Sequence, residues 1–107
     1  MANRHLSRTV AMQTLYEWDF NGRKEQLKDL AKHNIEQLAP GMEDTAFIYD
    51  LLVGVESNLE DIDKTIIETA PEWPLDQITV VDRNILRIGI FELIFEKQVP
   101  PKVAINE

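Results

Sequence analysis

The sequence contains no cysteine, and this absence excludes disulfide bonds, thiolate metal sites and cysteine nucleophiles. It has two histidines, His5 and His33, and neither has a partner at the spacing of a metal site. Its four glycines are scattered and form no phosphate-binding loop. Glu56 and Glu60 lie one helical turn apart, a pattern more typical of a solvated helix face than of a catalytic carboxylate pair. The sequence therefore predicts no enzyme, no metal site and no cofactor.

Long apolar runs are also absent. No stretch approaches the roughly 20 residues that a helix needs to cross a bilayer, and the first residues lack the apolar segment of a signal peptide. Hydrophobic residues make up 44% of the chain and charged residues 28%, which is typical of a globular protein. We therefore expect a single cytoplasmic domain over residues 1–107, with no membrane contact.

Positive charge is scarce over most of the chain. Eleven Lys and Arg oppose nineteen Asp and Glu, and the net charge of −8 argues against indiscriminate binding to nucleic acid. The first sixteen residues differ, because they contain two arginines, one histidine and no acid. A helix start ordinarily favours acids, so this basic end conflicts with local electrostatics and is a candidate for function.

Apolar residues recur at spacings of three and four, which predicts helices. A strand over residues 88–95 is rejected, because the apolar stretch is too long and no partner strand is evident. The fold class is therefore an all-α bundle of about five to six helices. We expect helices from Asn3 or Ser7 to Phe20, at 25–38, at 48–66 and from Thr79 through 85–95, a single turn at 75–78, and a helix beginning at 102–107.

The segment 85–95 is apolar on nearly every side, which predicts a helix at the centre of the bundle. An unpaired charge there would be costly, so Arg87 is expected to pair with Glu92 or with an acid of the 48–66 helix. Asp82 and Arg83 lie at the exposed start of the same helix. For these two residues, contact with a partner protein and simple solvation remain alternatives.

The basic end combines arginines with an aromatic ring. Arg4 and Arg8 are four residues apart and share a helix face, and Tyr16 lies about 80° around the helix from Arg8. Arginine for phosphates and an aromatic ring for an unstacked base are what recognition of single-stranded RNA requires. The alternative is that Tyr16 is half-buried packing and the arginines are merely solvated, and composition alone slightly favours it.

Specific motifs occur in order along the chain. They are RHLSRxxAxQxLYxW at 4–18, DLLxGV at 50–55, VDRxILRIxxFEL at 81–93 and VPxKVAINE at 99–107. Together they resemble the NusB family of bacterial transcription antitermination factors over the whole chain. The resemblance implies an all-α fold of two small packed bundles and a non-enzymatic function.

The resemblance also implies partners and site residues. The expected partners are NusE, which is a small-subunit ribosomal protein, the single-stranded boxA RNA of ribosomal RNA operons, and the RNA polymerase antitermination complex. Carried over to this sequence, the resemblance assigns RNA binding to Arg4, His5, Arg8, Gln13 and Tyr16, and NusE binding to Asp82 and Arg83.

The sequence departs from the family in two ways. Its basic cluster is thinner than in strongly RNA-binding relatives, and family members continue past the AINE motif into further helices. We therefore expect a truncated bundle that lacks its last helices, with apolar surface exposed on the 85–95 helix. Lower stability than a full-length relative and formation of a homodimer are the expected consequences.

Two other functions fit the same sequence. One is the NusB-like accessory domain of a ribosomal RNA cytosine methyltransferase, whose chain would continue into a catalytic domain. The other is a helical protein-interaction module without a role in RNA binding. Replacement of Arg4 and Arg8 would leave RNA affinity unchanged in the second case.

Overall fold

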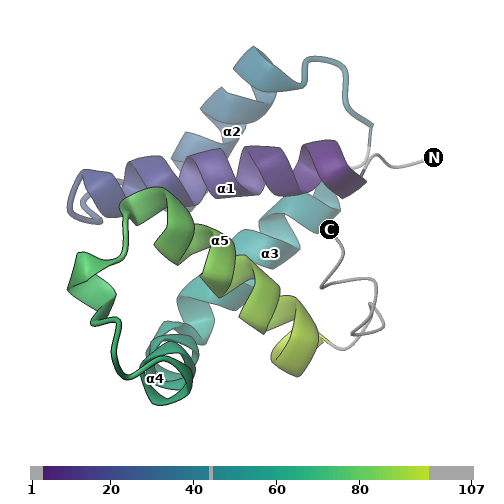
Figure 1. Cartoon of the computed structure of the whole chain (residues 1–107). Helices are drawn as coiled ribbons and strands as arrows, with labels where there is room; N and C mark the ends of the chain where they lie inside the picture. Colours follow the sequence, from purple (N-terminus) through teal and green to yellow (C-terminus); the bar gives the residue numbers. More distant parts are fainter. Residues whose placement is uncertain (1–3, 44, 97–107) are drawn as a thin grey trace. The chain divides into compact units, whose positions relative to one another are not determined.

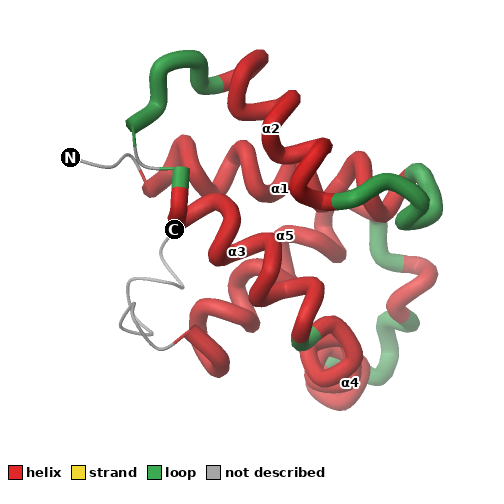
Figure 2. Tube along the Cα trace, turned by 180° about the vertical axis from the view of Figure 1, so that it is seen from behind, coloured by secondary structure: helices red, strands yellow, loops and turns green. Residues whose placement is uncertain are grey.

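The computed structural model describes residues 4–43 and 45–96, and these contain helices and turns but no strand (Figure 2). This confirms the all-α fold class; the helix expected at 102–107 lies outside the described residues. None of the helices in the described ranges is long and apolar enough to cross a membrane. Along the chain of Figure 1 the elements are α1 (Arg4–Phe20), α2 (Leu27–Leu38), α3 (Ala46–Ser57), α4 (Leu59–Thr69), the 3₁₀ turn η1 (Leu75–Gln77), α5 (Val80–Ile90) and the π-helix η2 (Phe91–Glu96).

The chain divides into two compact units, residues 1–53 and 54–107. In the first unit, α2 packs against α1 and crosses it at an angle (Figure 1). The start of α3 supplies Ile48, Leu51 and Leu52 to the core. The buried apolar residues of α1 and α2 are Val10, Ala11, Leu15, Trp18, Leu27, Leu30 and Ala31.

A glycine with positive φ follows the end of each of the helices α1 and α2. α1 ends at Phe20, and Gly22 has φ +80°; α2 ends at Leu38, and Gly41 also has φ +80°. A side chain would be strained at this φ, so glycine suits the turn after each helix. Both predicted helix ends are confirmed.

A buried amide joins α2 to α1. Asn34 is 4% exposed, and its Nδ2 donates to Thr14 Oγ1 at 3.1 Å and to Glu17 Oε2 at 3.4 Å. Thr14 Oγ1 in turn donates to the carbonyl oxygen of Val10 at 2.8 Å. The apolar interface between the two helices therefore contains a polar cluster in which the amide nitrogen of Asn34 is satisfied.

The long helix predicted over 48–66 is wrong as a single element, because it is divided at Asn58 into α3 and α4. Asn58 leaves the helical conformation, with φ −112° and ψ 18°. Its side-chain Nδ2 donates to the carbonyl oxygen of Gly54 at 2.8 Å, in competition with the backbone N–H of Asn58 at 3.1 Å. Asparagine side chains can form such bonds to nearby backbone groups, and these bonds compete with the regular hydrogen bonds of a helix.

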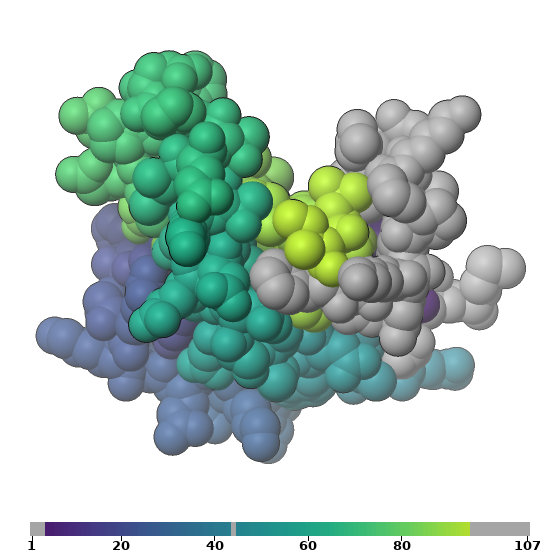
Figure 3. Space-filling model, turned by 90° about the horizontal axis from the view of Figure 1, so that it is seen from below, coloured from purple at the N-terminus to yellow at the C-terminus, as the bar shows by residue number. Residues whose placement is uncertain are grey.

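In the second unit, α4 packs against η1 and α5, and α5 continues into η2. The apolar core is formed by Val55, Ile62, Ile66, Ile88 and Phe91. The space-filling view shows α4 and the segment after it at the surface (Figure 3), where Glu60, Asp61 and Glu68 are exposed. Glu56 and Glu60 are both exposed but lie on different helices, in keeping with solvated acids.

The prediction that the 85–95 helix lies at the centre of the bundle is wrong, whereas the expected exposure of apolar surface on this helix is confirmed. Within α5, Asn84, Arg87 and Ile88 are buried, whereas Ile85 and Leu86 are exposed. Ile94, in η2, is exposed as well. One side of α5 is therefore buried and the other is exposed to solvent, although the sequence carries apolar residues on both sides.

α5 begins directly after Thr79, where the sequence predicted the start of a helix. The Thr79 hydroxyl oxygen accepts a hydrogen bond from the backbone N–H of Asp82 at 3.1 Å, and Asp82 adds an acid to the first turn. The predicted turn at 75–78 is confirmed by η1, whose carbonyl at Leu75 accepts from the backbone N–H of Ile78 at 3.3 Å.

We expect Thr79→Ala to lower the free energy of unfolding by about 1 kcal/mol, because the N–H of Asp82 loses its acceptor. Chemical denaturation followed by circular dichroism measures this change. Thr69→Ala removes an exposed threonine hydroxyl at the last residue of α4 and serves as the control. Equal stability of the two variants would contradict a capping role for Thr79.

Candidate nucleic-acid interface

The two arginines at the start of α1 converge on one aromatic ring. The Cζ of Arg4 lies 4.0 Å from the ring centroid of Phe47, and the Cζ of Arg8 lies 5.4 Å from the same centroid. Both distances are within the range of a cation–π interaction. The first turn of α1 contains no acid. The helix therefore begins with two neighbouring cations held at a ring from the first turn of α3.

A second aromatic feature lies at the other end of α1. The rings of Tyr16 and Phe20 are stacked, with centroids 5.7 Å apart and an angle of 17° between the planes. Phe20 is 62% exposed, and Tyr16 is half-buried. The exposed ring of Phe20 therefore extends the surface that Tyr16 offers to a planar ligand.

The remaining predicted RNA-binding residues of α1 have different surroundings. His5 is exposed, and its carbonyl oxygen accepts from the Thr9 hydroxyl at 3.0 Å. Gln13 is half-buried, and its Nε2 donates to Glu17 Oε1 at 2.9 Å. Glu17 also accepts from Asn34, so the amide of Gln13 belongs to the polar cluster between α1 and α2.

These residues share the solvent side of α1. At about 100° per residue, Arg8, His5, Tyr16, Phe20 and Gln13 follow one another around the helix over about 140°. The buried residues of α1 lie on the other side, against the core of the first unit. Arg4 precedes Arg8 by one turn at the exposed helix start. A basic region and an aromatic region therefore lie along one accessible helix surface.

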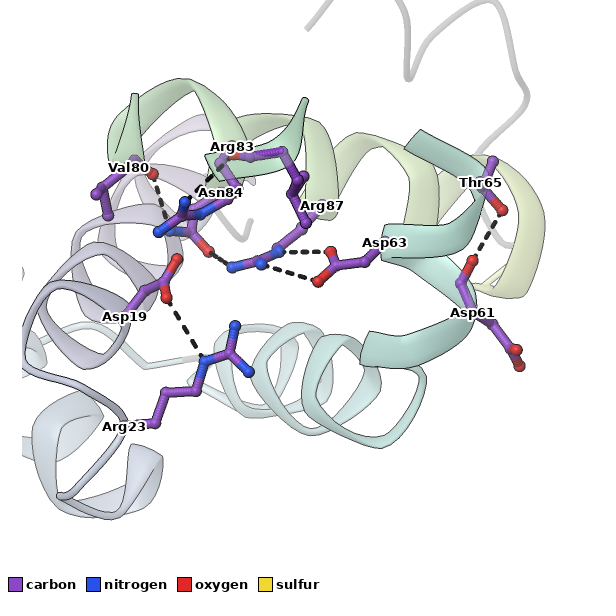
Figure 4. A network of polar contacts seen from close by, with 10 residues as sticks. Asp19, Arg23, Asp61, Asp63, Thr65, Val80, Arg83, Asn84 and Arg87 are labelled. Atoms are coloured by element: carbon purple, nitrogen blue, oxygen red, sulfur yellow. Dashed lines mark hydrogen bonds and ion pairs between the residues drawn. The ribbon is translucent and has the colours of Figure 1, made fainter. Parts of the chain in front are cut away.

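Another cation, Arg23, follows α1 and contacts residues of its last turns. Arg23 follows α1 in the left-handed conformation, with φ 61°, and its Nε lies 3.5 Å from Asp19 Oδ1 (Figure 4). Its Cζ also lies 5.2 Å from the ring of Trp18. Arg23 thus contacts two residues at the C-terminal end of α1. It is not among the residues predicted to bind RNA.

Asp82 and Arg83 lie in the first turns of α5. Asp82 is exposed, and Arg83 is half-buried, with its Nη1 donating to the carbonyl oxygen of Leu75 at 3.4 Å. The guanidinium of Arg83 is therefore directed toward η1. Of the two predicted NusE-binding residues, Asp82 presents the larger accessible fraction.

The expected partner of Arg87 is confirmed as an acid of the predicted 48–66 helix. Arg87 is 1% exposed, and its Nε and Nη2 donate to the two carboxylate oxygens of Asp63 at 2.8 and 2.9 Å (Figure 4). Its Nη1 donates to Asn84 Oδ1 at 3.0 Å, and Asn84 donates to the carbonyl oxygen of Val80 at 2.8 Å. This network joins α5 to α4, and the buried arginine supports the second unit.

Residues 4–43 and 45–96 contain no cluster of three potential metal ligands. The groups that α1 offers to a ligand are the cations at its start and the stacked rings of Tyr16 and Phe20. The model of the NusB family matches residues 5–107 of this chain. The chain belongs to the NusB family.

Curated relatives support this assignment. The transcription antitermination protein NusB of Clostridium novyi is 41% identical to this chain over 107 residues, which cover 98% of this chain and 79% of the relative. The relatives' names designate antitermination proteins and no enzyme, in agreement with the non-enzymatic function expected from the sequence. The resemblance to NusB found in the motifs is confirmed.

Solved NusB structures have the same fold. T. maritima NusB superposes with a TM-score of 0.86 and 28% identity, covering 99% of this chain and 74% of that one. A crystal structure of the antitermination factors NusB and NusE in complex with double-stranded RNA matches with a TM-score of 0.80 and 32% identity, covering 94% of this chain and 74% of that chain. The second structure shows that a NusB relative assembles with NusE and RNA.

Two aromatic residues of this surface are absent from the sequence prediction. Phe47 lies far from Arg4 and Arg8 in the sequence, so only the folded chain brings its ring to them. Phe20 could have been found, because it lies four residues after Tyr16 and at the helix end, where a large apolar side chain is readily exposed. The charge pattern alone identified the basic half of the surface.

Proposed function

We propose that this NusB protein is a non-enzymatic, RNA-binding transcription antitermination factor that acts in the cytoplasm. With NusE it binds single-stranded boxA RNA of ribosomal RNA operons and helps RNA polymerase to resist termination. The observation that carries the proposal is the solvent side of α1, where Arg4 and Arg8 precede the stacked pair of Tyr16 and Phe20. The structure of a NusB relative with NusE and double-stranded RNA supports NusE and RNA as partners.

Each part of the α1 surface has a role in the proposal. Arg4, His5 and Arg8 contact phosphates, where guanidinium groups offer several N–H donors to oxygen. Tyr16 stacks on an unpaired base, and Gln13 contributes a polar group beside it. A single strand exposes the faces of its bases, whereas a duplex covers them, so the aromatic half of the surface favours single-stranded RNA.

NusE binds elsewhere in the proposal, at the start of α5. Asp82 is exposed there and offers a carboxylate, and Arg83 adds a half-buried cation. The acidic character of the chain, with a net charge of −8, favours association with a basic ribosomal protein. Such charge complementarity acts mainly on the rate of association and on partner choice.

Fluorescence anisotropy with boxA-type RNA, with and without NusE and across a salt series, tests the proposal. We expect Arg8→Ala to weaken RNA binding severalfold and to flatten the slope of log affinity against log salt by about one, because one phosphate contact is lost. The matched control is Lys32→Ala, which removes one charge from an exposed position on α2. Duplex RNA of the same sequence is expected to bind more weakly.

The outcomes separate the alternatives. Equal salt slopes for Arg8→Ala and Lys32→Ala would remove Arg8 from the site. If the folded wild-type chain binds NusE but binds no RNA, either by itself or in the presence of NusE, the chain is a protein-interaction module. Tighter binding to duplex than to single strand would contradict the proposed role of Tyr16.

A further inference from the structure

Phe47 connects the core of the first unit with the basic end of α1. Its ring is 8% exposed, and the next residue, Ile48, is fully buried. The backbone N–H groups of Ile48 and Tyr49 donate to the carbonyl oxygen of Thr45 at 3.1 and 3.2 Å, which fixes the first turn of α3. Phe47 therefore belongs to a well-packed turn and has a defined position.

The position of this ring matters because two cations lie at it. Arg4 and Arg8 are one helical turn apart, and like charges at this spacing repel each other. They also lie at a helix N-terminus, where the helix dipole disfavours cations. Attraction to the π face of Phe47, at 4.0 and 5.4 Å from the two Cζ atoms, opposes both effects.

Contact of the arginines with the ring is compatible with the binding of anions. A guanidinium group that lies flat on a ring uses its face, whereas its N–H donors lie in its plane and point outward at its edge. Binding through the edge is how arginine recognises phosphate oxygens. A ring beneath two arginines can therefore order both side chains and leave the geometry of phosphate recognition intact.

We propose that Phe47 is a positioning residue of the RNA site, which orders the Arg4 and Arg8 side chains before RNA binds. This inference rests on the proposed function and deepens it, because it assigns a role to a residue that does not itself touch RNA. Without the ring, the long arginine side chains lose a contact that orders them, so more of their ordering occurs when the complex forms, and this lowers affinity.

Phe47→Leu tests the inference, because leucine keeps the position apolar and removes the ring. We expect RNA affinity to fall about threefold to tenfold. The salt slope is expected to stay as in the wild type, because both arginines still reach their phosphates, whereas Arg4→Ala and Arg8→Ala flatten it. Phe47→Tyr keeps the ring and is expected to retain wild-type affinity.

A second measurement detects the contact between the arginines and the Phe47 ring in the absence of RNA. The side-chain NMR resonances of Arg4 and Arg8 are expected to shift in Phe47→Leu, because the ring current of Phe47 is lost. Ile48→Val removes one methyl group from the adjacent buried position and is the matched control for a general packing defect. It is expected to change neither the arginine resonances nor the RNA affinity.

The design separates failure of the inference from failure of the proposed function. If Arg4→Ala and Arg8→Ala weaken RNA binding and Phe47→Leu does not, the site stands and the role of Phe47 is overturned. Unchanged arginine resonances in Phe47→Leu would also overturn it. If the folded wild type binds no RNA with or without NusE, the proposed function fails and the role of Phe47 fails with it.

Discussion

Replacement of Asp63 by alanine is expected to lower the free energy of unfolding by about 3–5 kcal/mol, because it removes the carboxylate from a buried guanidinium. Arg87 is 1% exposed and donates to both oxygens of Asp63. Its bond to the neutral Asn84 oxygen remains in the variant and does not replace the two bonds to the Asp63 carboxylate. Urea denaturation followed by circular dichroism measures the loss.

The opposite half of the pair gives the control. The Asp63 side chain is 18% exposed, so in Arg87→Met the carboxylate that remains can reach water. We therefore expect Arg87→Met to cost less than Asp63→Ala. The double variant Asp63→Leu with Arg87→Met is expected to approach wild-type stability, since an apolar pair can replace a buried ion pair. Together with the single variants Asp63→Leu and Arg87→Met it forms a double-mutant cycle. Additive losses in this cycle would contradict an energetic link between the two side chains.

Gly54→Ala is expected to destabilise the chain by about 1–3 kcal/mol, although alanine is the better helix former. A Cβ atom at position 54 would overlap the tip of the Phe91 ring, which packs directly on the glycine. Phe91 is buried, so its ring can move aside only by disturbing the core of the second unit. Thermal unfolding and denaturant midpoints measure the effect.

Gly89→Ala is the matched control. Gly89 lies in α5. Apart from its two chain neighbours and the nearby backbone of its own helix, no described atom lies within 4 Å of a Cβ atom placed at position 89. The intrinsic preference of a helix for alanine is therefore unopposed, and we expect stability to rise by up to about 1 kcal/mol. Equal effects of the two substitutions would show that the contact between Gly54 and Phe91 does not limit packing.

Helix ends were predictable from the sequence because their signals are local. Gly22 and Gly41 follow α1 and α2, and Thr79 caps α5, each acting on its own neighbours. The break at Asn58 escaped prediction because the apolar spacing of four and three continues across it. Val55 and Ile62 are both buried, so the pattern reflects two helices that each face a core. Hydrophobic periodicity indicates which residues are buried, and only the Asn58 side chain indicates that one helix ends and the next begins.

The candidate site was predictable where it depends on α1 alone. The charge pattern identified Arg4 and Arg8, and helix geometry placed Tyr16 near them. Phe47 could not be found, because its meeting with the arginines depends on how α3 packs against α1. The central position predicted for the 85–95 helix was also wrong, since hydrophobicity does not determine which side of an apolar helix meets a neighbour, and Ile85 is exposed.

The Asn34 amide has a consequence for which structure the chain selects as it folds. Apolar side chains such as Leu30 and Ala31 would tolerate α2 sliding by a turn along α1, because one apolar contact resembles another. Sliding would carry the amide of Asn34 away from Thr14 and Glu17, and a buried amide without partners costs about 1–3 kcal/mol. A single polar side chain therefore separates the native pairing of the two helices from its nearest misaligned competitor.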